Sequence, residues 1–129
     1  MQISRNLGVL AAAAGLSLAA PAFAHTHVVS STPAASATAS NVRSVTITFN
    51  EAFMPALTGM EIVMTGMPGM AGHHPAMKIA GVKVTPSADR KALVAALPRP
   101  LAAGTYDANW HAVGADTHRM TGKVSFTVR

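Results

Sequence analysis

An all-β fold, an antiparallel sandwich or barrel of about seven short strands, is predicted by two features of the sequence. Apolar and polar residues alternate with period two in several short segments, as they do in half-buried strands. Glycine and proline separate these segments, so turns are expected between them. The sequence shows no convincing amphipathic helix and no internal repeat, so nothing in it favours a helical layer.

The first four strands are predicted between residues 28 and 85. A short strand at 28–30 opens the domain, and segment 42–49 alternates valine, isoleucine and phenylalanine with serine and threonine. Segment 59–64 leads directly into a stretch that is rich in glycine and proline. Segment 77–85 is expected to be one strand, in which Gly81 marks a bulge or turn.

Three further strands are predicted in the rest of the chain. Segment 91–97 is bounded by prolines, although its alanines weaken the pattern. In segment 105–113 Trp110 shares one face with other apolar residues, and segment 122–128 alternates valine and phenylalanine with polar residues. The alanine- and serine-rich stretch 34–40 is instead expected to be a connecting loop.

Residues 1–24 have the three parts of a secretory signal peptide. Arg5 supplies a positive charge, an apolar run follows, and residues 22–24 (Ala-Phe-Ala) form a small-x-small cleavage sequence. The apolar run is shorter than the about 20 residues that a membrane span needs. Cleavage at this point would make His25 the N-terminus of a single domain, residues 25–129, outside the cytoplasm; an uncleaved anchor is the alternative.

Composition narrows the classes of ligand and partner. The chain has no cysteine, so it can form no disulfide, and a metal site must use histidine, methionine, carboxylates or the terminal amine. The formal net charge is +5, but the basic residues are scattered and aromatic residues make up only 5% of the chain. Nucleic-acid binding is therefore not expected.

Residues 64–77 are expected to form a copper-binding loop, because their glycines and prolines would break a helix or a central strand. Thioether sulfur is a soft ligand that selects Cu(I), and imidazole also suits copper. The candidate ligands are Met64, Met67, Met70, Met77 and one of the adjacent residues His73 and His74. Two alternatives stay open: Met60 and Met64 are core residues of a strand, or the loop is an adhesive protein-binding surface.

A second metal site is predicted from residues that lie far apart in the sequence. His25 would supply its imidazole and, after cleavage, its α-amine, whose pKa in model peptides is about 7.7–8.0. Asp116 and His118 are two residues apart, so in an extended segment their side chains point the same way and can converge on one ion. Nitrogen and oxygen donors of this kind suit Cu(II).

His27 offers a competing mode of Cu(II) binding. A histidine at the third position of the mature chain can bind with the terminal amine and two intervening backbone amides. That mode would leave Asp116 and His118 out, and it competes with the His25-centred mode for the same amine. His111, beside Trp110 on a strand, is expected to be half-buried rather than a ligand.

Four stretches of the chain resemble the CopC family of periplasmic copper-binding proteins, and the match covers essentially all of residues 25–129. The stretches are His25 with residues 28–33 (Val-Val-Ser-Ser-Thr-Pro), residues 49–51 (Phe-Asn-Glu), residues 64–70 (Met-Thr-Gly-Met-Pro-Gly-Met), and residues 110–118 with Thr121 and Gly122. The resemblance implies a seven-stranded Greek-key β-barrel or sandwich of the cupredoxin-like or Ig-like kind.

The resemblance also implies site residues and partners. The family's Cu(II) site matches His25, Asp116 and His118, with Glu51 as a further residue near it. Its Cu(I) site matches the four methionines of the loop and one histidine. The chain departs from the family pattern in having two histidines in a longer loop and in having His27. Members are associated with copper resistance and homeostasis, often beside a membrane copper-import protein.

These observations favour a non-catalytic periplasmic copper carrier that holds Cu(I) and Cu(II) at separate sites. It would be a monomer that passes copper to an inner-membrane copper transporter or to another periplasmic copper protein. Two other functions stay open. One is a histidine-brace copper oxygenase, which would need an aromatic-rich binding face, whereas this chain has one Trp and one Tyr. The other is an Ig-like interaction module with a Met-rich surface.

Overall fold

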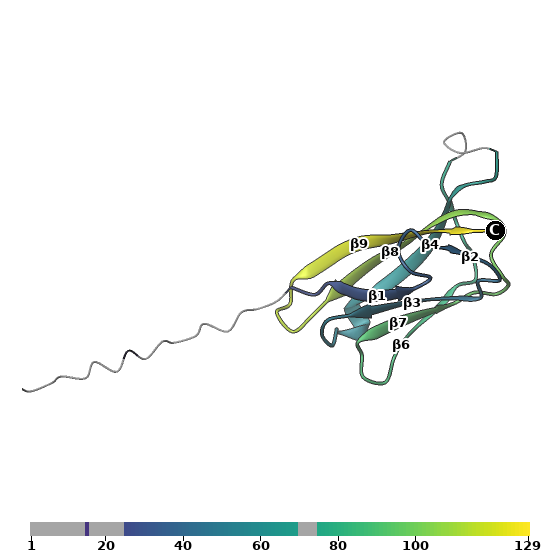
Figure 1. Cartoon of the computed structure of the whole chain (residues 1–129). Helices are drawn as coiled ribbons and strands as arrows, with labels where there is room; N and C mark the ends of the chain where they lie inside the picture. Colours follow the sequence, from purple (N-terminus) through teal and green to yellow (C-terminus); the bar gives the residue numbers. More distant parts are fainter. Residues whose placement is uncertain (1–14, 16–24, 70–74) are drawn as a thin grey trace, which may run out of the picture.

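The structure, a computed structural model of the chain, describes residues 15, 25–69 and 75–129. Two β-sheets form a sandwich (Figure 1), as the sequence predicted. The strand order is β1-β3-β7-β6 in the four-stranded sheet and β2-β9-β8-β4-β5 in the five-stranded sheet. The elements are β1 (Val28–Thr32), β2 (Thr38–Ala39), β3 (Ser44–Phe49), the 3-10 helix η1 (Pro55–Leu57), β4 (Gly59–Gly66), β5 (Met77–Lys78), β6 (Lys83–Pro86), β7 (Ala92–Ala96), β8 (Gly104–Val113) and β9 (Arg119–Val128).

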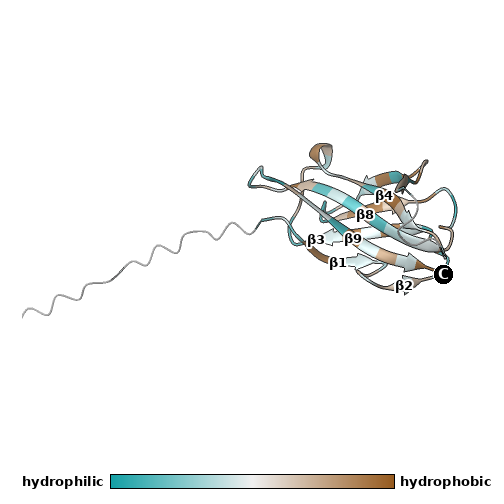
Figure 2. Ribbon diagram, turned by 90° about the horizontal axis from the view of Figure 1, so that it is seen from above, coloured by the Kyte–Doolittle hydropathy of each residue, from teal (hydrophilic) through white to brown (hydrophobic). Residues whose placement is uncertain are grey.

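The core lies between the two sheets and is built by the predicted alternation. Val45, Ile47 and Phe49 of β3 are buried in the same cluster as Tyr106 and Trp110 of β8. Phe49 and Trp110 meet edge to face with their ring centroids 5.1 Å apart, an arrangement that aromatic pairs favour. Hydrophobic and hydrophilic residues accordingly follow one another along the strands in Figure 2.

Segment 77–85, predicted as one strand, is divided between the two sheets. It forms β5, which pairs with β4, and β6, which pairs with β7. Gly81 lies between them with a φ of +76°, and a Cβ at this position would lie 3.3 Å from the ring of Pro98. The feature expected at Gly81 is therefore a turn, and it carries the chain from one sheet to the other.

The stretch 34–40, predicted as a loop, contains the two-residue strand β2. This strand lies parallel to the end of β9. Main-chain hydrogen bonds from Ser36 to Ser125 and from Thr127 to Ala37 hold the stretch in place. The contact covers an edge of the five-stranded sheet that would otherwise be open to other chains.

The two ends of the sandwich carry different candidate ligands. The chain before β1 and the turn between β8 and β9 lie at one end, which we call the histidine end (His25, Asp116 and His118). The chain between β4 and β5 lies at the other, the methionine end (Met67 and Met77; Figure 1). The 10 residues of β8 separate the two ends, a length of about 30 Å at the usual rise of a strand. Among the described residues, no helix is long and apolar enough to cross a membrane.

Candidate metal centre

His25, Asp116 and His118, the three residues predicted to bind Cu(II), lie together at the histidine end. Their potential ligand atoms all lie within 4.8 Å of one another. Nδ1 of His25 is 3.2 Å from Oδ2 of Asp116, and Nδ1 of His118 is 3.4 Å from the same oxygen. Donors bound at about 2.0–2.1 Å from one ion lie roughly 3 Å apart. The two imidazole–carboxylate distances are therefore those of neighbouring donors around one ion.

The cluster is open to solvent on its histidine side. The side chains of His25 and His118 are 59% and 68% exposed, whereas that of Asp116 is only 10% exposed. The carboxylate thus forms the floor of the cluster and the two imidazoles form its rim. An ion can enter or leave such a site without a rearrangement of the sandwich.

Asp116 and His118 converge through a turn, so the expectation of an extended segment is wrong. The turn between β8 and β9 is closed by a hydrogen bond from the N–H of Thr117 to the carbonyl of Gly114. Thr117 has a φ of +64°, in the left-handed region that threonine rarely adopts. The N–H of His118 donates to Oδ1 of Asp116 at 3.1 Å, as in an Asx turn. This local bond, and not strand alternation, sets the two side chains side by side.

Asp116 is held in its ionised form. Its pKa is lowered from the usual value, first because the N–H of His118 donates a hydrogen bond to the carboxylate. Partial burial opposes this effect, while the hydrogen bond from His25 and the charges of both histidines lower the pKa further. A carboxylate in this state can bind a cation without first losing a proton.

Thr26, which lies between the two N-terminal histidines, anchors the chain beneath the cluster. Its side chain is completely buried, and among the described residues it is the only buried polar one. Its hydroxyl donates to Oε1 of Glu51 at 2.7 Å. A side chain at Gly114 would collide with both groups. Glu51 lies outside the three-residue cluster, so its contact with the site runs through Thr26.

Asn50 holds the main chain on either side of Thr26. Its side-chain oxygen accepts the N–H of His27 at 2.8 Å, and its amide nitrogen donates to the carbonyl of His25 at 3.3 Å. The competing His27 mode would need the deprotonated amide nitrogens of Thr26 and His27. Because the N–H of His27 is already bonded and Thr26 is buried, the fold opposes that mode and favours the arrangement centred on His25.

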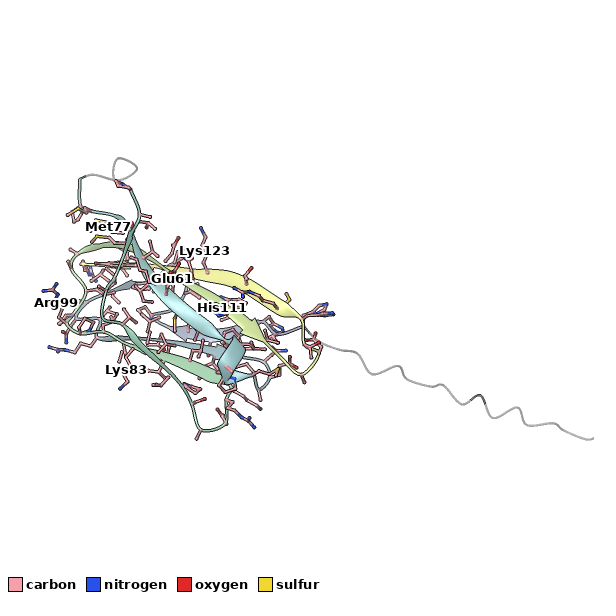
Figure 3. All side chains as sticks on the ribbon, turned by 180° about the vertical axis from the view of Figure 1, so that it is seen from behind. Glu61, Met77, Lys83, Arg99, His111 and Lys123 are labelled. Atoms are coloured by element: carbon pink, nitrogen blue, oxygen red, sulfur yellow. The ribbon has the colours of Figure 1, made fainter. Side chains whose placement is uncertain are left out.

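The methionines predicted to bind Cu(I) lie in two environments. Met64 is 6% exposed and belongs to the core, as does Met60. Both therefore lie where the alternative interpretation, core residues of a strand, placed them. Met67 and Met77 are 43% and 54% exposed, and Figure 3 shows Met77 at the methionine end. Met77 is the register partner of Met64, so the two Cβ atoms are expected about 4.5–5.5 Å apart. Met70, His73 and His74 lie outside the described residues.

His111 lies on the outer face of the five-stranded sheet, away from the cluster (Figure 3). Its ring covers Gly59 on the neighbouring strand, where a Cβ would come within 2.8 Å of Cε1. The side chain is half-buried, as the sequence predicted.

Thr26, Asn50 and Gly114 support the cluster, and sequence reasoning assigned none of them a role. Thr26 is an ordinary polar residue in the sequence, and only its burial shows what it does. Asn50 left a weak signal, because a polar pair directly follows the buried end of β3. Gly114 left another, since it ends the alternating pattern of β8 just before the predicted ligands.

A mainly antiparallel sandwich with two histidines and a carboxylate gathered at one end defines a class of protein: small β domains with a candidate metal site outside the core. The family model described as the CopC domain matches residues 28–129. The chain therefore belongs to the CopC family.

Named relatives and a solved structure agree with this assignment. Copper resistance protein C of Xanthomonas campestris pv. juglandis is 44% identical over 110 residues, which cover 85% of this chain and 84% of that protein. Copper resistance protein C of Pseudomonas syringae pv. tomato is 39% identical over the full length of both. The crystal structure of PcoC, a methionine-rich copper resistance protein from Escherichia coli, superposes with a TM-score of 0.73 at 38% identity and covers 82% of this chain and all of that one.

Proposed function

We propose that this protein is a periplasmic copper carrier that acts in copper resistance and homeostasis, with separate sites for Cu(II) and Cu(I). The observation that carries the proposal is the cluster of His25, Asp116 and His118, whose potential ligand atoms lie within 4.8 Å of one another. Membership of a family whose relatives are named copper resistance proteins supports the choice of copper.

The Cu(II) site uses the two imidazoles and the ionised carboxylate of the cluster. Removal of residues 1–24 as a signal peptide frees the α-amine of His25, which then adds a nitrogen donor from the same residue. Nitrogen and oxygen donors in such a set suit Cu(II). Glu51 acts through Thr26 to hold the N-terminal chain, because its carboxylate already accepts the threonine hydroxyl.

The Cu(I) site lies at the methionine end. Met67 and Met77 are exposed there, and Met70 with His73 or His74 completes a soft donor set that suits Cu(I). Met64 is the remaining candidate. Its side chain packs in the core, whereas its register partner Met77 is exposed, so a ligand role would require the side chain of Met64 to turn outward.

Transfer to another protein follows from the exposure of both sites. Donors that remain in contact with solvent can be exchanged for those of a partner, and a closed site would hold its ion. The recipient in this proposal is an inner-membrane copper transporter or another periplasmic copper protein, and the carrier acts as a monomer.

The proposal distinguishes a carrier from an oxygenase of the histidine-brace kind. Such an enzyme needs an open coordination position for its co-substrate, whereas Oδ2 of Asp116 lies within 3.4 Å of both imidazoles and would fill one. The carrier should show no oxygen-dependent cleavage of polysaccharides when loaded with copper, and such cleavage would favour the enzyme.

Spectroscopy of the loaded protein tests the two ligand sets separately. Electron paramagnetic resonance of the Cu(II) complex should show nitrogen couplings that change in His118→Ala and are unaltered in Met67→Ala/Met77→Ala. X-ray absorption of the Cu(I) complex should show sulfur neighbours that are reduced only in the methionine variant. The assignment would be contradicted if His118→Ala bound Cu(II) as well as the native protein, or if the methionine variant bound Cu(I) as well as the native protein. If the native protein bound no copper, the interaction module would be favoured.

A further inference from the structure

The charges of the described residues are distributed unevenly between the two ends of the sandwich. Toward the histidine end, the carboxylates of Glu51, Asp89 and Asp116 accompany the cations Arg90, Lys91 and Arg119, so the two signs of charge balance there. The methionine end carries Arg43, Lys83 and Arg99, none of which has an ion-pair partner among the described residues. This end therefore has unbalanced positive charge.

Strand register and main-chain bonds place the three cations at the same end. Lys83 pairs with Ala96, which pairs with the first residue of β3, directly after Arg43. Arg99 follows β7 within three residues. Figure 3 shows Arg99 and Lys83 in the same half of the molecule as Met77. The nearest side-chain carboxylates by strand register are those of Glu61 and Asp107. Both are already paired: Glu61 lies 3.6 Å from the ammonium group of Lys78, and Asp107 lies 3.7 Å from that of Lys123.

A groove opens beside Arg99 at the base of the chain that links β4 to β5, and Lys83 and Arg43 lie outside its lining at the same end of the sandwich. It encloses about 510 Å³ between β5 and the segment 98–102, with Lys78 and Arg99 on its walls. Its lining is otherwise mainly apolar and includes Met64, Ile79, Leu101 and Tyr106. The hydroxyl of Tyr106 donates to the carbonyl of Ala102 at 2.6 Å, so the aromatic ring is fixed against this segment.

We propose that this groove is a docking site for an acidic segment of the protein that receives copper, with apolar side chains in the groove and carboxylates on Arg99, Lys83 and Arg43. This inference rests on the proposed function, because it assigns the surface to copper transfer. A partner seated here would lie next to Met77 and Met64, which are register partners. Unpaired cations around an apolar site attract and orient a partner of opposite charge.

The shape of the surface favours a protein segment over a lipid headgroup. A membrane surface would contact an array of cations without need of a recess, whereas here Arg99 borders a mainly apolar groove. Among the described residues, the two-residue strand β5 is the outermost strand of its sheet, and its Lys78 lines the groove. An extended segment can therefore also bond to the outer edge of β5. This edge, the apolar lining and the cations fit a short acidic peptide.

The test uses the purified protein without copper and a short fluorescent peptide of alternating Asp and Leu. We expect this peptide to bind in a fluorescence anisotropy titration and the matching Asn-Leu peptide to bind at least about tenfold more weakly. Added salt should weaken binding of the acidic peptide. The double variant Lys83→Glu/Arg99→Glu should lose about tenfold or more in affinity for the acidic peptide.

The matched control is Arg90→Glu/Lys91→Glu, which makes the same change in net charge outside the groove and should leave binding unchanged. Equal binding of both peptides, or equal losses in the two double variants, would overturn the proposal. So would binding of the protein to phosphatidylglycerol vesicles through Lys83 and Arg99 without binding of the peptide. Thermal unfolding of each variant verifies that it is folded.

The peptide titration tests the docking site separately from the proposed copper sites, because the assay contains no copper. If copper binds as proposed and the peptide does not, only the docking site fails. If Lys83→Glu/Arg99→Glu binds Cu(I) with unchanged affinity but loses the peptide, both proposals stand and the cations serve docking alone.

Discussion

Asp116 is the residue on which the candidate Cu(II) site depends most, because both imidazoles and the N–H of His118 contact its carboxylate. Replacement by asparagine keeps the size of the side chain and removes its charge. We expect Asp116→Asn to lower Cu(II) affinity by about 100-fold or more, since even residues that only support a metal ligand contribute about 10–100-fold. A competition titration with a chelator of known affinity measures the change.

The lowered pKa of Asp116 also predicts a pH dependence without metal. A carboxyl group whose pKa is lower in the folded state stabilises the fold above its ordinary pKa, and that contribution disappears as pH falls through the lowered value. The stability difference between the native protein and Asp116→Asn should therefore be present at neutral pH and vanish well below about pH 4. Asp89→Asn is the control, because Asp89 also has a lowered pKa. It should show a similar loss of pH-dependent stability, but unlike Asp116→Asn it should leave Cu(II) affinity unchanged.

Gly114 tests whether the buried contact of Thr26 with Glu51 positions the site. An added methyl group would collide with both side chains, and crowding of this kind typically costs about 1–3 kcal/mol. We expect Gly114→Ala to lower stability in urea and to weaken Cu(II) binding about tenfold or more. The exposed neighbour Ala115, changed to serine, should alter neither. Unchanged Cu(II) affinity in Gly114→Ala would show that this contact does not position the ligands.

At the scale of single residues, the sequence predicted which side chains meet but not how they are held. Histidine and aspartate are recognisable as ligands by their chemistry, so His25, Asp116 and His118 could be selected from the sequence alone. The left-handed Thr117 and the buried hydroxyl of Thr26 depend on contacts between distant parts of the chain. No local pattern encodes such contacts, so the sequence predicts an extended segment where the structure has a turn.

At the scale of elements, the methionines within β4 are buried, whereas Met67, just after this strand, is exposed. Met64 is buried, and truncation of a buried methionine costs about 2–5 kcal/mol. We therefore expect Met64→Ala to lower the free energy of unfolding by this amount. Met67→Ala should change it by less than about 0.5 kcal/mol and weaken Cu(I) binding. Urea denaturation and Cu(I) titration measure the two effects, and a stable Met64→Ala would show that its side chain is not a core residue.

A strand was predictable where its own residues alternate between apolar and polar, because this pattern can be read without knowing its neighbours. The long ladder of β8 with β9 and the buried face of β3 follow directly from period-two patterns. The division of segment 77–85 into β5 and β6 does not follow from such a pattern, because the same apolar residues fit one strand or two. Which sheet each half joins is decided by its neighbours in space, β4 and β7.

For the whole molecule, the main consequence is the separation of the two candidate sites. Because β8 spans the distance between the two ends, about 30 Å at the usual rise per residue, the two sites share no side chains and should bind independently. We expect Cu(I) bound at the methionine end to leave Cu(II) affinity unchanged, and the converse. Titration of each ion with and without the other measures this, and a change of about tenfold in either affinity would contradict it.

The proposed Cu(II) site is tested by comparing the chain that begins at His25 with a variant that carries one extra residue before it. Both are titrated with Cu(II), and separately with Cu(I) under reductant. We expect the first protein to bind one equivalent of each ion. The extended variant should lose only the tight Cu(II) site, because its α-amine no longer belongs to His25. Cu(II) binding that survives the extension unchanged would contradict the role of the terminal amine and, with it, the Cu(II) site proposed here.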